Sequence, residues 1–273
     1  MKAVARRRKR RRRKREESPL AESSLRLFMD RIVLDREIEI GREVILEGPP
    51  LEALRVQGDR VGSIVTLTDA QQRDFRGRVL QLSKERASIL PFETFSASTE
   101  SPFEIILLQA LPEKERMEWI IQKATELGVS TIVPFKSMKS ISLEEREARQ
   151  KKAHRWQEIA VKAVQQSRRA RVPRVERYRP FHEVLECGES GAIKILLWEK
   201  GGESLREVLK KYSGSGGKIY LMVGPEGGFA TEEVNLARER GFIPVKLGQR
   251  ILRTETAAIT LIGILQYELG DLG

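Results

Sequence analysis

From residue 103 onwards, short apolar segments alternate with longer amphipathic ones, and this alternation constrains the fold more than any other feature of the sequence. Buried strands are predicted at residues 104–108, 130–135, 193–197, 219–223 and 244–247. Helices are predicted at residues 113–127, 143–167 and 204–212, and two more begin near Thr231 and Thr254. Strands that alternate with helices form a mostly parallel sheet covered on both faces, so this part is predicted to be an α/β domain.

The preceding part of the chain has a different pattern, with short strand-like segments separated by turn residues. These segments are residues 25–29, 44–46, 63–68, 77–82 and 87–90. Turns are predicted at 47–50, 58–59 and 68–69, and a linker at 92–102. Five short strands this close together predict a small antiparallel barrel, which is either a general sheet domain or a nucleic-acid-binding one.

The positive charge of the chain is concentrated near its start. Residues 6–15 are ten consecutive Lys or Arg; without them, 40 of the 50 basic residues remain against 39 acidic residues. Such a run of like charges cannot bury apolar surface, so residues 1–19 are predicted to be a disordered basic arm. The arm is interpreted either as a phosphate contact for RNA or as a solubilising extension.

Several classes of protein are disfavoured by composition. No apolar run reaches the roughly 20 residues that span a bilayer, and no apolar segment follows the basic block as in a secretory signal. Cys187 is the single cysteine, and His154 and His182 are the two histidines, so no disulfide framework and no metal site are expected. A cytoplasmic protein without membrane or metal partners is predicted.

The most informative motif is Gly224-Pro225-Glu226-Gly227-Gly228, which lies between a buried strand and a helix. Glycines let the backbone turn tightly and approach a ligand, and the carboxyl ends of parallel strands are where such sheets bind small molecules. The motif is neither a Walker loop nor a dinucleotide fingerprint. Glu232 and Glu233 place negative charge at the helix start, which favours a cationic or neutral ligand over a phosphate. A tight connection without a ligand is the alternative.

A second motif, residues 245–257, is predicted to bring Arg250, Arg253, Thr254 and Glu255 together at a helix start. Thr254 can cap the helix, and Glu255 is favourable in its first turn. Arg253 is on the unfavourable side of the helix dipole, so an anion such as an RNA phosphate or a uracil oxygen is expected nearby. The helix that follows, residues 257–265, is apolar on nearly all sides, which predicts cover by the core or by a second subunit.

Together these motifs resemble a known family. Gly224-Pro225-Glu226-Gly227-Gly228-Phe229 and residues 247–257 are similar to the paired C-terminal signature of the 16S ribosomal RNA uridine-N3 methyltransferases, the RsmE family of the SPOUT superfamily. Residues 113–129 and Gln166-Ser167-x-Arg169 with Val172-Pro173 match two further segments. More loosely, Leu54-Arg55-Val56 resembles a motif of the family's PUA-like RNA-binding barrel.

The resemblance implies a fold, a reaction and partners. The fold would be a PUA-like β-barrel at residues 20–95 and a SPOUT methyltransferase domain at 103–273, an α/β unit with a knotted parallel sheet and a C-terminal trefoil knot. The activity would be S-adenosylmethionine-dependent methylation of N3 of a uridine in 16S rRNA of the small ribosomal subunit, by a homodimer. A non-catalytic RNA-binding protein, a SPOUT enzyme for another RNA and a Rossmann-type methyltransferase are the alternatives.

The resemblance also implies site residues. Arg253 would stabilise the uracil anion, with Glu226, Glu255 or water as proton acceptor. The predicted cofactor-binding residues are Leu197, Gly224, Pro225, Glu226, Gly227, Gly228, Leu247, Gly248, Arg250, Ile251, Leu252 and Thr254. The predicted RNA-binding residues are Arg55, Gln166, Arg169 and Arg171, although the arginines of 163–173 are equally compatible with a solvated helix end.

Overall fold

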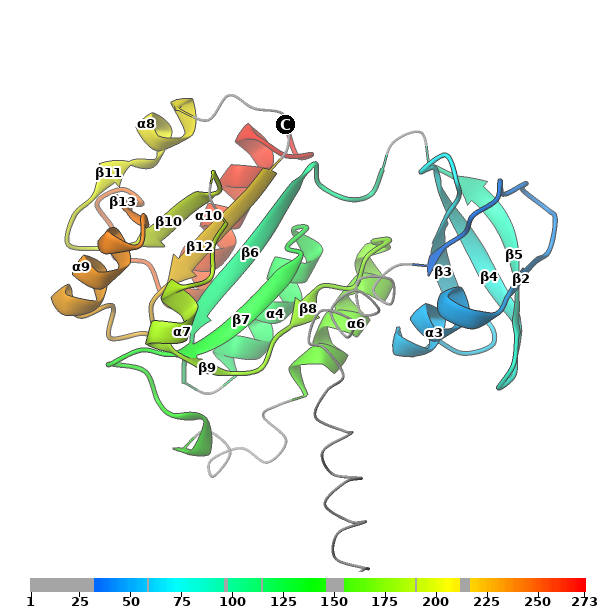
Figure 1. Cartoon of the computed structure of the whole chain (residues 1–273), viewed down its shortest axis with the longest axis horizontal. Coiled ribbons are helices and arrows are strands. Elements are labelled where there is room, and N and C mark those ends of the chain that lie inside the picture. Colours follow the sequence, from blue (N-terminus) through cyan, green and yellow to red (C-terminus); the bar gives the residue numbers. More distant parts are fainter. Residues whose placement is uncertain are drawn as a thin grey trace, which may run out of the picture. The chain divides into compact units, whose positions relative to one another are not determined.

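The computed structural model (Figure 1) describes residues 32–273 except 58, 96–97, 114, 146–154, 190 and 212–216. The predicted basic arm, the strand at 25–29 and His154 therefore lie outside the described residues. The chain divides into two compact units, Met1–Phe95 and Ser96–Gly273. This boundary falls within the predicted linker, although strand β5 (Ala87–Thr94) continues into the first part of it.

The first unit contains a five-stranded sheet in the order β1-β3-β4-β5-β2. Besides β5, its strands are β1 (Ile32–Val33), β2 (Val44–Leu46), β3 (Ile64–Thr68) and β4 (Asp74–Leu82). The pairs from β3 to β2 are antiparallel, whereas β1 pairs with β3 in parallel. The four predicted strands that can be compared are thus confirmed. Burial alternates along β2, whereas β3 and β5 contain consecutive buried residues.

One element of this unit was not predicted. Residues 47–50 begin a helix, α3 (Gly48–Val56), and do not form the expected turn. Proline is compatible with the first helical positions because its missing N–H has no partner there, which is the signal that the turn interpretation overlooked. Leu51 and Leu54 on this helix are buried in the core of the unit, whereas Arg55 lies on its outer side.

The second unit is an α/β domain with a parallel sheet in the order β11-β13-β10-β12-β6-β7-β8, and β9 pairs with β7. Its strands are β6 (Phe103–Ala110), β7 (Thr131–Lys136), β8 (Arg174–Val175), β9 (Arg179–Pro180), β10 (Ile193–Leu197), β11 (Glu203–Ser204), β12 (Gly217–Val223) and β13 (Ile243–Lys246). Its helices are α4 (Arg116–Glu126), α6 (Trp156–Ser167), α7 (Phe181–Leu185), α8 (Leu205–Lys210), α9 (Thr231–Glu239) and α10 (Thr254–Glu268).

The side chains of the central strand β6 show that helices cover both faces of the sheet. Ile105 and Leu107 pack into a core with α4, α6, α8 and α10, whereas Ile106 and Leu108 pack into a second core with α7 and α9. Figure 1 shows α7 on the near side of the sheet and α10 on the far side. A strand with both faces buried has a continuous apolar sequence, as predicted.

The predicted continuous helix at 143–167 is interrupted at Arg155, and residues 146–154 lie outside the described part of the chain. Residues 143–145 are helical, and the expected capping box is present, with Glu145 N donating to Ser142 Oγ at 3.1 Å and Ser142 N donating to Glu145 Oε2 at 2.7 Å. A separate helix, α6, begins at Trp156, because Arg155 has a ψ of 31° that does not continue a helix. The apolar stripe of α6 is confirmed: Trp156, Ala160 and Ala163 are buried.

Candidate functional site

The glycine motif forms a turn at the carboxyl end of β12. Gly224 and Pro225 are buried, and Gly228 N donates a hydrogen bond to Pro225 O at 3.0 Å. Gly228 has a φ of +65°, and a Cβ there would lie 2.9 Å from Glu199 Oε1. A Cβ on Gly227 would lie 3.1 Å from the Cβ of Lys139. Glycine is thus required at these positions by the backbone angle and by close neighbours.

Two other strand ends lie beside this turn. Leu197-Trp198-Glu199 leaves the end of β10, and Trp198 N donates to Val245 O of β13 at 3.0 Å. Residues 247–253 connect β13 to α10, with Gly248 at a φ of +71°. Carboxyl ends of neighbouring parallel strands meet at one edge of a sheet, so segments distant in sequence converge here.

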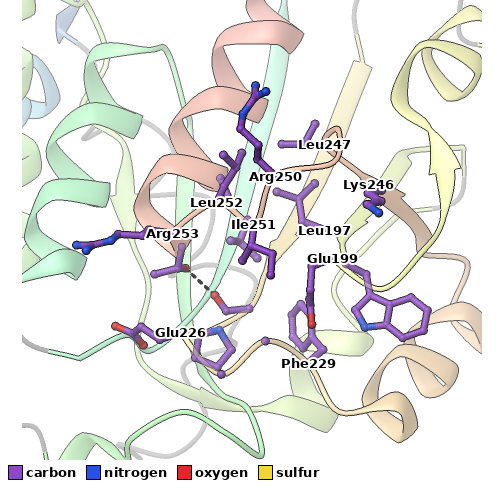
Figure 2. A pocket seen from close by; sticks show the side chains of 18 of the residues that line it. Leu197, Glu199, Glu226, Phe229, Lys246, Leu247, Arg250, Ile251, Leu252 and Arg253 are labelled. Atoms are coloured by element: carbon purple, nitrogen blue, oxygen red, sulfur yellow. Dashed lines mark hydrogen bonds between the residues drawn. The ribbon is translucent and has the colours of Figure 1, made fainter.

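The three segments enclose a pocket of about 500 Å³ (Figure 2). This volume is within the range of small-molecule sites. All twelve residues predicted to bind the cofactor line the pocket, as do Arg116, Trp198, Glu199, Val223, Phe229, Val245, Lys246, Gln249, Arg253 and Ala257. The sequence prediction therefore selected residues that the fold brings together from three strand ends.

A buried hydrogen-bond network joins two walls of the pocket. Thr254 Oγ1 donates to Gly224 O at 2.6 Å, the contact drawn as a dashed line in Figure 2, and Gln109 Nε2 donates to Thr254 Oγ1 at 3.1 Å. Thr254 was predicted to cap α10, but the N-cap residue is Arg253, and Thr254 is the first helical residue. Its hydroxyl instead fastens the helix start to the glycine turn.

An acidic side chain already occupies the start of α9. Glu233 is 2% exposed and accepts hydrogen bonds from Ala230 N at 3.0 Å, Met138 N at 2.9 Å and Ser137 Oγ at 3.1 Å. The helix end therefore has its own carboxylate, which excludes a phosphate from the position that a nucleotide phosphate takes in dinucleotide sites.

A cluster of three charged residues borders the pocket. Glu226 Oε1 accepts hydrogen bonds from Glu113 N at 2.9 Å and from Arg116, and Arg116 Nε lies 3.9 Å from Glu255 Oε2. Glu226 lines the pocket, whereas Glu255 is not among its lining residues. Both predicted proton acceptors therefore lie close to Arg116, whose position on α4 gave no sequence signal of its own.

The two predicted arginines of the second motif are not brought together. Figure 2 shows Arg250 and Arg253 extending in different directions from the loop that carries them. Both are exposed, and Arg253 forms the N-cap of α10 through its backbone. No hydrogen bond or ion pair of the Arg253 guanidinium is present among the described residues, so this cation remains available to an anion.

The predicted RNA-binding residues fall into two groups. Gln166 is exposed at the end of α6, and Arg171 is partly exposed and lies 3.3 Å from Glu104. Arg55 donates to Glu52 and to the carbonyls of Ser83, at 3.1 Å, and Lys84, so its guanidinium is engaged within the first unit. Arg55 therefore has partners within its own unit but keeps exposed surface, and its contact with RNA stays a prediction.

Arg169 requires the clearest correction. Its side chain is 4% exposed, donates to the carbonyls of Thr125 and Val129 at 2.8 and 2.9 Å, and pairs with Glu100 at 2.5 Å. Four of the five N–H donors of this guanidinium are used inside the protein, and its burial leaves almost no surface on which RNA could contact it. Arg169 therefore has a structural role in place of the predicted RNA contact.

Two broader expectations concern metals and membranes. Within the described ranges, no group of three or more His, Cys, Asp or Glu could hold a metal ion. Among the same residues, no helix is both long and apolar enough to cross a bilayer.

Comparisons with known proteins agree with this geometry. The profile of the RNA methyltransferase domain matches residues 99–266. The ribosomal RNA small subunit methyltransferase E of Bacillus subtilis is 31% identical over 247 residues, which are 85% of this chain and 95% of that protein. The chain belongs to this methyltransferase family.

Solved structures of relatives extend the family assignment to the fold. The family member from Neisseria gonorrhoeae, solved with S-adenosyl methionine, is 34% identical, with a TM-score of 0.65 over 90% of this chain and 100% of that chain. A putative methyltransferase from Legionella pneumophila, solved with the same cofactor, is 30% identical, with a TM-score of 0.62 over 89% and 99%.

Proposed function

We propose that this chain transfers a methyl group from S-adenosylmethionine to N3 of a uridine in 16S rRNA of the small ribosomal subunit. The observation that carries the proposal is the pocket of about 500 Å³, whose walls are built from the two motifs of the methyltransferase family and from the end of β10. Its volume and its glycine-lined wall fit a cofactor of this size.

The proposed chemistry assigns different tasks to the two sides of the pocket. When bound, S-adenosylmethionine supplies an activated methyl group. The backbone of residues 224–228 and 247–252 holds the cofactor, while Arg253 stabilises the negative charge that develops on the uracil as N3 loses its proton. Glu226 is proposed as the proton acceptor: of its two oxygens, only Oε1 accepts hydrogen bonds from described residues, and Arg116 orients the carboxylate.

Binding of rRNA is proposed to involve both units. The five-stranded sheet and α3 of the first unit are proposed to form the PUA-like RNA-binding domain. Gln166 and Arg171 are the remaining candidates on the second unit, because both have exposed surface. Replacing Arg171 with Ala should weaken rRNA binding in a filter-binding assay; unchanged affinity would remove Arg171 from the interface.

We further propose a C-terminal trefoil knot, a homodimer and a cytoplasmic location. The chain leaves β13, next to β10, and then reaches α10, which packs against α4, while Thr254 bonds to Gly224 at the end of β12. Residues 247–253 run from β13 past the end of β10 to the end of β12, and this crossing supports the proposed knot. An experimental structure in which residues 247–253 run outside all other segments would refute the knot.

The function is tested with purified protein, S-adenosylmethionine carrying a labelled methyl group, and small ribosomal subunits lacking the modification. Nucleoside mass spectrometry should detect N3-methyluridine in 16S rRNA, with naked 16S rRNA and large subunits as comparison substrates. Cofactor binding without methyl transfer to any of these RNAs would contradict the proposal. The Glu226→Gln variant should lose activity at neutral pH and recover part of it at alkaline pH, where the uridine imide ionises unaided.

A further inference from the structure

Glu199 is a pocket residue to which neither the motifs nor the family comparison assigns a role. It lies two residues after the end of β10 and lines the pocket. Its Oε1 and Oε2 lie 2.9 and 3.1 Å from the position that a Cβ on Gly228 would occupy, so the absent side chain of Gly228 leaves room for the carboxylate. No described residue donates a hydrogen bond or forms an ion pair with Glu199.

Both carboxylate oxygens are therefore free to accept hydrogen bonds from a ligand. Figure 2 shows Glu199 on a different side of the pocket from Glu226 and Arg253, where methyl transfer is proposed to occur. Resting on the proposed function, we infer that Glu199 binds the vicinal hydroxyl groups of the cofactor's ribose and thereby determines affinity for the nucleoside part of the cofactor.

The chemistry of the cofactor favours the ribose over its reacting centre. A carboxylate beside the sulfonium would stabilise the cationic ground state more than the transition state, in which that charge is lost, and would slow the reaction. Two adjacent hydroxyls present two O–H donors to two carboxylate oxygens. An acidic side chain after a parallel strand binds ribose hydroxyls in this way in dinucleotide-binding folds.

The test is the affinity of the whole protein for S-adenosylhomocysteine, measured by isothermal titration calorimetry. Glu199→Gln keeps the shape of the side chain but removes its charge and one acceptor, and it should weaken binding about 10- to 100-fold. Glu232→Gln is the matched control, because Glu232 is exposed in the first turn of α9 and does not line the pocket. The control should bind like the parent protein.

Ligand analogues identify the group that Glu199 contacts. The loss should be the same for 5′-methylthioadenosine, which lacks the amino-acid tail, and for S-inosylhomocysteine, which lacks the exocyclic amine. It should disappear for an S-adenosylhomocysteine analogue without ribose hydroxyls. A loss that is confined to ligands with the tail or with the exocyclic amine would overturn the ribose assignment.

The affinities also separate this inference from the proposed function. If the parent protein binds S-adenosylhomocysteine and Glu199→Gln binds it equally well, only the role of Glu199 is refuted. If the parent protein binds neither S-adenosylmethionine nor S-adenosylhomocysteine, both the proposed function and the role of Glu199 are refuted. Circular dichroism of Glu199→Gln should match the parent spectrum, since the side chain has no described partner to lose.

Discussion

At the scale of single residues, Arg253 separates catalysis from cofactor binding. Replacing Arg253 with Ala should lower the rate of methyl transfer by about 10²- to 10³-fold, because it removes the charge proposed to stabilise the uracil anion. Affinity for S-adenosylmethionine should stay within a few-fold of the parent, since the sulfonium is a cation. Single-turnover kinetics and calorimetry measure the two effects. Arg206→Ala, an exposed arginine of α8 outside the pocket, should change neither.

Gly227 is expected to affect cofactor binding directly, in contrast to Arg253. A valine there would bring its Cβ within 3.1 Å of Lys139 and force the turn to move, so Gly227→Val should abolish cofactor binding. Calorimetry compares the affinity of Gly227→Val and Arg253→Ala for S-adenosylmethionine. The role proposed for Arg253 is wrong if its variant methylates at the parental rate, or if it loses cofactor binding as fully as Gly227→Val.

Arg169 should affect stability and not RNA recognition. Replacing it with Met removes the cation that pairs with Glu100 and the hydrogen bonds to two carbonyls, which should lower the free energy of unfolding by about 3–5 kcal/mol. Arg174→Met is the control, because its ion pair with Glu176 is at the surface and should cost at most about 1 kcal/mol. Urea unfolding of both variants measures the difference. Equal stability of the two would mean that Arg169 is not a structural cation.

At the scale of elements, the start of α10 and the end of β12 act together through Thr254. Thr254→Val keeps the shape of the side chain but removes the donor to Gly224 O, and should destabilise the protein by about 1–3 kcal/mol. Cofactor affinity should also fall, because the two loops no longer hold each other. Thr231→Val, at an exposed position of α9 outside the pocket, should leave both quantities unchanged. Thermal unfolding with and without cofactor measures both effects. A Thr254→Val variant with the Tm and the cofactor-induced rise in Tm of the parent protein would show that the contact is unimportant.

Most helices and strands were predictable from the sequence, and the two wrong predictions have local causes. Residues 104–108 read as a buried strand because both faces of β6 are covered, so apolar residues run without alternation. Residues 47–50 read as a turn because proline and glycine are frequent in turns, yet proline is equally suited to the first positions of α3. The helix at 143–167 read as continuous because apolar spacing persists across Arg155, where the backbone leaves the helical region.

At the scale of the whole molecule, α10 presents an outward surface whose charges, Glu255 and Glu268, lie at its two ends. Thr256, Thr260 and Tyr267 are exposed and Ile259 and Gly263 are partly exposed on this helix, whereas Ala258, Leu261 and Leu265 face the core. The predicted all-round burial of α10 is therefore not reached within one chain. Between these ends the surface consists of uncharged and mostly small or apolar residues, which suits a second copy of the chain and supports the proposed homodimer.

The homodimer can be tested on this surface. Ile259→Glu should convert the protein to a monomer, because a charge would be buried without a partner in the interface. Leu236→Glu is the control: Leu236 is 46% exposed on α9, so its substitution should leave the dimer intact. Multi-angle light scattering at micromolar concentration gives the mass of each. A parent protein that is monomeric under these conditions would exclude the dimer directly.

The sequence alone determined the two-part organisation and the α/β class of the second unit, because both follow from local periodicity. Its resemblance to the methyltransferase family predicted the residues that line the pocket. Only the tertiary structure decided which side chains are available for chemistry. Arg169 and Arg171 look alike in the sequence, yet one is buried by Glu100 and two carbonyls that come from distant segments. Glu199 and Arg116 reach the pocket only because strand order and helix packing bring separate segments to one edge of the sheet.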